Sequence, residues 1–166
     1  MTNGPLLHFR LGGKEAGDEL PLAAGGKAEA FAAALRSIVP LDHAQIVCNG
    51  EVVHELELAG DRTSVDAAGE IALGRSGWCV LRAYAEKATH PILDLYPFAS
   101  TSPVYVTVGG QPARSREDAA FFVKWMDRVL EFTRSRKSWN TPEEQAAVIS
   151  YMAKARAIFA TKAKAE

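Results

Sequence analysis

The sequence predicts a mainly β protein, an immunoglobulin-like antiparallel β-sandwich followed by two C-terminal α-helices. Up to about residue 112, short apolar runs alternate with turn signals, and no helical pattern intervenes as it would in a parallel α/β sheet. From about residue 113 onward, two capped segments carry apolar residues at steps of three and four. We therefore expect a sandwich over residues 1–112 and a helical extension over residues 113–166 that packs on it.

The first half of the expected sandwich is divided by glycine pairs and proline. Gly4-Pro5 precedes a strand expected over residues 6–11, and a short strand over 20–22 ends at Gly25-Gly26. Residues 28–37 are ambiguous, because their alanines favour a helix. The turn signals on both sides of that segment favour a strand, which is the structure we expect there.

The clearest local signal is Asn49-Gly50, which lies between apolar runs at residues 44–48 and 51–58. Asn and Gly readily adopt the positive φ angles that a type I′ hairpin turn requires. The second run alternates with period two, which indicates a strand with one wet face. Its apolar face holds Val52, His54, Leu56 and Leu58, and its other face holds Val53, Glu55 and Glu57.

Three further strands are expected over residues 70–73, 78–85 and 104–108. In the middle one, Trp78, Val80, Arg82 and Tyr84 share one face, and Cys79, Leu81 and Ala83 share the other. Because both faces are largely apolar, this run is expected at the centre of a sheet.

Both helices have recognisable N-terminal caps. Ser115 precedes an acidic first turn, and Thr141 is followed by Pro142 and then by Glu144, which completes a capping box. The first helix has an apolar stripe that we expect to pack on the sandwich or on the second helix: Phe121, Phe122, Trp125, Val129 and Phe132. Residues 161–166 are expected to fray.

Composition excludes several classes of function. The net charge is −1, so the chain lacks the basic excess typical of nucleic-acid binding. No apolar run approaches the roughly 20 residues that a membrane span needs. We therefore expect a soluble protein with no nucleic-acid and no membrane partner, whose compartment the sequence leaves open.

No residue pattern indicates catalysis by this chain. None of the four histidines has a second histidine or a cysteine at the spacing of a zinc site, and no serine lies in a nucleophile-elbow motif. Cys48 and Cys79 are expected to be buried free thiols, although they could form a disulfide if the chain is exported. We expect no catalytic residue and no metal ligand.

The segment over residues 90–103 is the most informative loop, because it is long and proline-rich yet strongly apolar. A loop of this kind either caps the open end of its own sandwich or contacts another surface. The second interpretation makes it an interdomain interface formed by His90, Pro91, Leu93, Asp94, Tyr96, Pro97 and Phe98.

Several strings resemble the C-terminal region of carbaryl-hydrolase-like proteins, a bacterial group within the PHP class of metallohydrolases (polymerase and histidinol phosphatase). The resemblance covers most of the chain in order and spacing. Its strings are TNGPLL at residues 2–7, VCNGEVV at 47–53, SGW at 76–78, HP at 90–91 through SPVYV at 102–106, and WNTP at 139–142.

The resemblance implies that this chain corresponds to a non-catalytic accessory domain that packs against an upstream catalytic domain. In this family the divalent metal is bound by paired histidines and acids of that upstream domain. The chain contains no matching motif, so no catalytic residue is carried over and no cofactor is expected in it. The parent protein would be a bacterial hydrolase of esters, amides or phosphoesters, which could be exported.

Two other functions fit the same sequence. The sandwich could be a ligand-binding or carbohydrate-binding module, for which Trp78, Tyr84 and Tyr105 are the aromatic candidates, although aromatic residues in strands are more often core residues. Alternatively, the terminal helices could mediate self-association and give a homo-oligomer.

Overall fold

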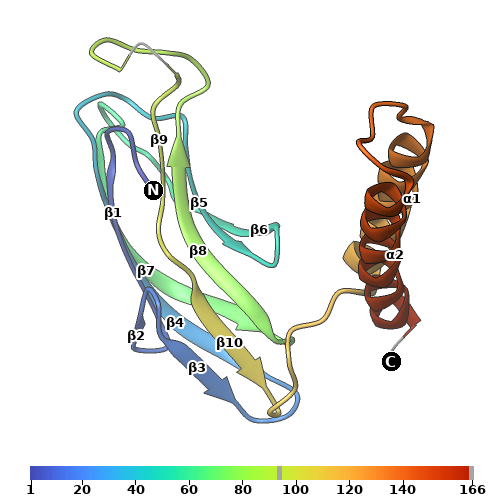
Figure 1. Ribbon diagram of the computed structural model, residues 1–166. Helices are drawn as coiled ribbons and strands as arrows, with labels where there is room; N and C mark the ends of the chain where they lie inside the picture. The colour runs from blue at the N-terminus through green and yellow to red at the C-terminus, as the bar shows by residue number, and fades with distance from the viewer. Residues whose placement is uncertain (93–94, 165–166) are drawn as a thin grey trace. The chain divides into compact units, whose positions relative to one another are not determined.

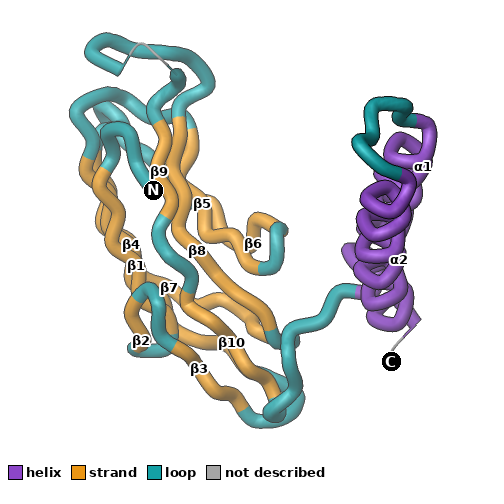
Figure 2. Tube along the Cα trace, viewed as in Figure 1, coloured by secondary structure: helices purple, strands orange, loops and turns teal. Residues whose placement is uncertain are grey.

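The computed structural model describes residues 1–92 and 95–164, and the chain divides into two compact units. Residues Met1–Ala113 form a unit of β-strands, and residues Arg114–Glu166 form a helical unit (Figures 1 and 2). Each unit has its own internal contacts. Among the described residues, no helix is both long and apolar enough to span a membrane.

The strands of the β unit are mostly those that the turn signals separate. They are β1 (Leu6–Leu11), β2 (Lys14–Glu15), β3 (Glu19–Leu22), β4 (Lys27–Arg36), β5 (His43–Cys48), β6 (Glu51–Glu55), β7 (Ser64–Leu73), β8 (Gly77–Tyr84), β9 (Phe98–Ser100) and β10 (Val104–Val108).

The strands form two sheets. The smaller sheet has the order β2-β1-β4-β7, and the larger has the order β3-β10-β8-β5-β6, with β9 also paired to β8. All pairs are antiparallel except β3 with β10, so the larger sheet is mixed rather than wholly antiparallel as the sequence predicted. Backbone hydrogen bonds hold β3 in this position, because Gly17 N donates to Pro103 O at 2.7 Å and Tyr105 N donates to Asp18 O at 2.9 Å.

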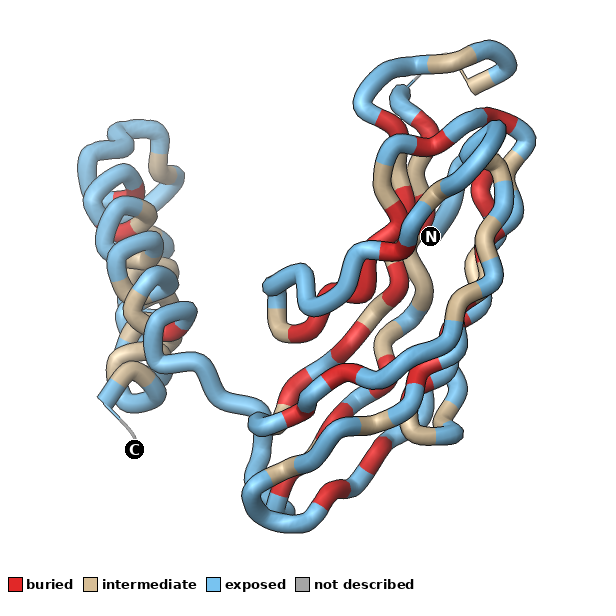
Figure 3. Tube along the Cα trace, turned by 180° about the vertical axis from the view of Figure 1, so that it is seen from behind, coloured by how far each residue is buried: buried red, intermediate tan, exposed pale blue. Residues whose placement is uncertain are grey.

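An apolar core drawn from both sheets holds them together. Phe9 and Leu35 contribute from the smaller sheet, and Ile46, Leu81 and Val104 contribute from the larger one; all five are buried almost completely. Buried and exposed positions alternate along the strands, as Figure 3 shows. This alternation is the expected pattern for strands with one face on a core.

The ambiguous segment at residues 28–37 is a strand, as predicted. It forms β4, whose buried Phe31, Ala33 and Leu35 alternate with more exposed residues. The helix propensity of its alanines is overridden by strand pairing, because every residue of β4 is paired with one of β7. The same pairing makes β7 longer than the predicted strand at 70–73.

The predicted hairpin turn is confirmed, since Asn49 and Gly50 have φ angles of 53° and 88°. The second arm differs from the prediction. β6 ends at Glu55, and the register with β5 shifts between Ile46 and Val47. Leu56 is buried beyond the strand end, whereas Val52 is exposed on the other side of the sheet.

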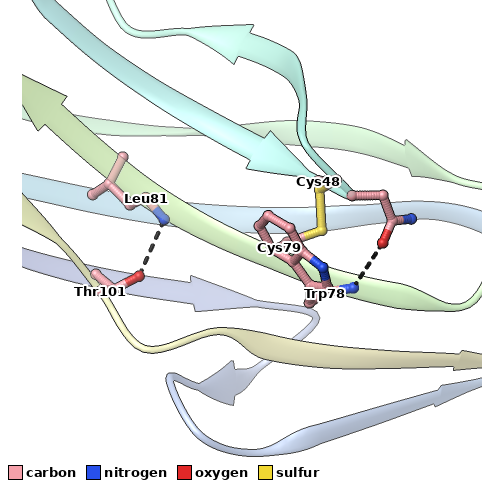
Figure 4. Close-up of a disulfide and its surroundings, with 6 residues drawn as sticks. Cys48, Trp78, Cys79, Leu81 and Thr101 are labelled. Atoms are coloured by element: carbon pink, nitrogen blue, oxygen red, sulfur yellow. Dashed lines mark hydrogen bonds between the residues drawn. A yellow bond between two sulfur atoms is a disulfide. The ribbon is translucent and has the colours of Figure 1, made fainter. Parts of the chain in front are cut away.

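Cys48 and Cys79 form a disulfide, so the expectation of free thiols is wrong. The two residues are direct partners in the β5–β8 register, with their Cα atoms 4.1 Å apart. Two nearby hydrogen bonds also hold β8 (Figure 4): the Trp78 N–H donates to Asn49 Oδ1 in the β5–β6 turn, and the Leu81 N–H donates to Thr101 Oγ1 just after β9, each at 3.1 Å.

The helical unit contains α1 (Arg116–Ser135) and α2 (Pro142–Lys164). Both predicted caps are confirmed: Ser115 Oγ accepts from the Asp118 N–H at 3.0 Å, and Thr141 Oγ1 accepts from the Glu144 N–H at 3.1 Å. The Glu144 carboxylate reaches back to the Asn140 N–H rather than to that of Thr141. α2 continues to Lys164, beyond the point at which fraying was predicted.

Within the helical unit the apolar stripe of α1 is largely exposed, so packing on α2 covers only part of it. Its packing on the sandwich stays a prediction. The buried residues of α1 are Ala119, Leu130 and Thr133, which lie on a different face of the helix. Phe122 stacks on Phe159 of α2, with ring centroids 5.0 Å apart, but Phe132 remains 67% exposed. The hairpin between the helices therefore uses one face of α1 and leaves most of the aromatic stripe uncovered within this unit.

Candidate binding surface

The outer face of the larger sheet carries two rows of side chains, each crossing β5, β8 and β9. Because Leu81 and Ala83 of β8 point into the core, the residues that alternate with them point outward. Residues directly opposite on neighbouring strands share a face of the sheet. The first row is Gln45, Arg82 and Ser100, and the second is His43, Tyr84 and Phe98.

Arg82 is a cation of this surface whose side chain is oriented by two neighbours, Gln45 and Tyr84. Its Nε donates to Gln45 Oε1 at 2.8 Å, and its guanidinium carbon lies 5.7 Å from the centroid of the Tyr84 ring. Gln45 is only 7% exposed, so it is a fixed acceptor. Among the residues that the structure describes, no carboxylate forms an ion pair with Arg82. The guanidinium is thus oriented by Gln45 and has no counter-charge within the described part of the chain.

Tyr84 also packs against His43. The two rings stack with centroids 4.6 Å apart, and His43 Nδ1 lies 3.1 Å from Glu55 Oε1. His43 Nε2 is 3.7 Å from a carboxylate oxygen of Glu86. A solvated or hydrogen-bonded histidine is what the sequence predicts at position 43, and the contact with Glu55 fits the second of these; the stacking on Tyr84 is an addition.

Asp42 fixes the chain where it leaves β8. Its Oδ2 accepts from the Glu86 backbone N–H at 2.8 Å, and its Oδ1 accepts from Arg62 Nη1 at 2.7 Å. The hydrogen bond from Glu86, assisted by the Arg62 guanidinium, holds the pKa of the Asp42 carboxyl below its ordinary value. The negative charge of Asp42 therefore persists to low pH and keeps Glu86 in place.

These side chains border a hollow of about 490 Å³, which we call the Arg82 hollow. This volume lies within the range of roughly 300–1,000 Å³ that is typical of small-molecule sites. Its lining combines two charged residues and a hydroxyl with aromatic and apolar surface. The lining residues are Arg82, Ala83, Tyr84, Ala85, Glu86, Tyr96, Phe98, Ala99 and Ser100.

The predicted interface residues divide between the hollow and the adjoining loop. Tyr96 and Phe98 line the hollow with their ring centroids 6.0 Å apart, and Tyr96 is 48% exposed. His90 and Pro91 are exposed but do not line the hollow, and Pro97 is buried. The remaining two, Leu93 and Asp94, lie outside the described residues.

A second aromatic area lies at the other end of the same face. Trp78 of β8 and Tyr105 of β10 are cross-strand partners, and they are 38% and 50% exposed. The expectation that aromatic residues in strands belong to the core therefore fails for both. Together with Tyr84, all three aromatic candidates for ligand binding lie on the outer face of β8 and β10.

No cluster of three or more His, Cys, Asp or Glu that could hold a metal ion occurs among residues 1–92 and 95–164. Sequence reasoning missed Gln45 and Arg82 as site residues. The alternation of residues 78–84 had placed Arg82 and Tyr84 on one face, but the partners from β5 and β9 depend on the register.

Comparison with known proteins adds no assignment: neither a family model nor a curated protein matches the chain.

Proposed function

We propose that this chain is a non-catalytic, immunoglobulin-like accessory module that docks on a partner domain through the loop at residues 90–98. The observation that carries this proposal is the exposed apolar surface of the loop. Leu95 and Tyr96 are both about half exposed, and Tyr96 continues into the Arg82 hollow. Large apolar side chains that project from a loop beside a hollow are typical of an interaction site.

The partner that we propose is the catalytic domain of a bacterial PHP-class metallohydrolase, which would provide the divalent metal and the reactive groups. The strings shared with carbaryl-hydrolase-like proteins support this choice. The disulfide between Cys48 and Cys79 supports an oxidising compartment, because such bonds persist mainly in exported proteins. The module would then act outside the cytosol, next to the catalytic site that it helps to shape or cover.

Hydrogen exchange tests the docking. The chain would be measured alone and joined to a PHP-class catalytic domain, and exchange in residues 90–98 should slow on joining, because docking removes water from their amides. Leu95→Ser should weaken this protection. Leu6→Ser is the matched control, since Leu6 is also an exposed leucine (68% against 58% for Leu95) but lies on β1 of the other sheet. Unchanged exchange at 90–98 in the joined protein would contradict the proposal.

Carbohydrate binding is a second candidate, favoured by the outward position of Trp78, Tyr84 and Tyr105. Exposed aromatic rings on one sheet face offer flat apolar surfaces to sugar rings. A screen of neutral and acidic oligosaccharides against the full chain tests this function. Binding should fall sharply when the three residues are changed together to alanine, and glycan binding that survives this change would count against it.

A further inference from the structure

We propose that the Arg82 hollow is a binding site for an acidic sugar, a uronic-acid residue whose carboxylate pairs with Arg82. This inference rests on the second candidate function, carbohydrate binding, and adds the ligand class and the position of the site.

The guanidinium is presented as a receptor for a carboxylate. Gln45 engages only Nε, so the hydrogen bond orients the guanidinium from one side. A planar guanidinium forms paired hydrogen bonds with a carboxylate, and these are stronger than neutral hydrogen bonds. Because no described carboxylate neutralises Arg82, an acidic ligand would supply the missing counter-charge.

The remaining lining suits the body of a sugar. Tyr96 and Phe98 provide aromatic surface for the C–H faces of a pyranose ring, and Ser100 provides a hydroxyl in the same row as Arg82. Glu86 also lines the hollow, and one of its carboxylate oxygens lies 3.7 Å from His43 Nε2. This carboxylate can accept hydrogen bonds from sugar hydroxyls.

Titrations of the full chain test the site with three probes: an oligogalacturonate, a neutral oligosaccharide of the same length, and benzoate. Calorimetry gives the affinities, and NMR shifts locate the binding. The oligogalacturonate should shift the signals of Arg82, Tyr84 and Phe98, and should bind at least about tenfold more tightly than the neutral sugar, as a charge-assisted pair predicts. Its affinity should fall by at least about tenfold in Arg82→Gln and less in Arg82→Lys.

Arg75→Gln is the matched control, because Arg75 is an exposed arginine that pairs with Glu51 away from the hollow; it should bind as the unchanged protein does. If an Arg82 variant folds poorly, the NMR shifts of the unchanged protein still show whether the ligand binds at Arg82, Tyr84 and Phe98.

Absence of any acidic-sugar binding, or binding that Arg82→Gln leaves intact, would overturn the proposal. Equal binding of the neutral sugar would also overturn it while leaving carbohydrate binding in place, so the two failures are distinguishable. Tighter binding of benzoate at the same residues would assign the hollow to aromatic acids and would likewise reject an acidic sugar.

Discussion

The β unit and the helical unit are stabilised in different ways. In the β unit, core residues from both sheets are almost wholly buried, and a disulfide links two central strands. In the helical unit, only three described residues of α1 are buried, and none of α2. The helices depend more on local bonds, such as the caps at Ser115 and Thr141, whereas the β unit depends on contacts between residues far apart in sequence.

Because their stabilisation differs, we expect the two units to respond differently to isolation, mutation and acid. A two-helix hairpin with few buried residues is marginal in water, because most helical stability in proteins comes from packing an apolar face. A two-layer β structure with a continuous core already packs its apolar faces and does not depend on a partner for stability.

Separating the units should have the largest effect. A fragment of residues 1–113 should unfold cooperatively near the melting temperature of the intact chain, whereas residues 114–166 alone should lose most of their helicity on dilution. Circular dichroism of both fragments over a range of concentrations checks this. Helicity that rises with concentration would support self-association through the helices. A dilute helical fragment that stays fully folded would contradict the comparison.

The disulfide comes next. Changing Cys48 and Cys79 together to alanine should lower the unfolding free energy of the β unit by about 3–4 kcal/mol, because the bond closes a loop with a sequence separation of 31 residues. Denaturant unfolding followed through tryptophan fluorescence and ellipticity measures the loss. The helical signal should not change, and an equal loss in both units would show that they unfold together.

Truncating one buried leucine in each unit gives a matched pair. Leu81→Ala should destabilise the β unit by about 3 kcal/mol, because Leu81 is completely buried and a rigid core relaxes little around a cavity. Leu130→Ala should destabilise the helical unit by about 2 kcal/mol, since a hairpin can close around the gap. Calorimetry of both variants checks the order, and the reverse order would refute the idea that the β unit is the more rigid.

Lowering the pH should have the smallest effect on stability, and this effect should be seen in the helical unit. Arg156 bonds to both carboxylate oxygens of Asp127, and the hydrogen bonds of this ion pair hold the pKa of Asp127 below its ordinary value of 3.8. The pair therefore stabilises the fold above about pH 4, and the contribution is lost as the pH falls through the lowered pKa. Helicity should fall slightly over that range when it is followed by circular dichroism. In the control variant Asp127→Asn, which lacks the ion pair, this fall should be absent.

Much of the local structure could be predicted, because its causes lie within a few residues. The turn at Asn49-Gly50, the caps at Ser115 and Thr141, and the two faces of residues 78–84 all follow from short patterns. The candidate site could be predicted only in part: Tyr96 and Phe98 were named in advance, but Arg82 and Gln45 were not. Their residue types are unremarkable, and their importance comes from being paired across strands.

The chain's local patterns thus predict the hairpin turn, both helix caps, the two faces of residues 78–84 and the change from strands to helices near residue 113. Only the tertiary structure decided that Cys48 meets Cys79, that β3 runs parallel to β10, and that the Gln45–Arg82 pair stands beside a hollow. The physical reason is that strand register joins residues tens of positions apart. A shift of two residues would keep the same residues on each face but change every cross-strand partner, so alternation within one strand does not specify the pairing.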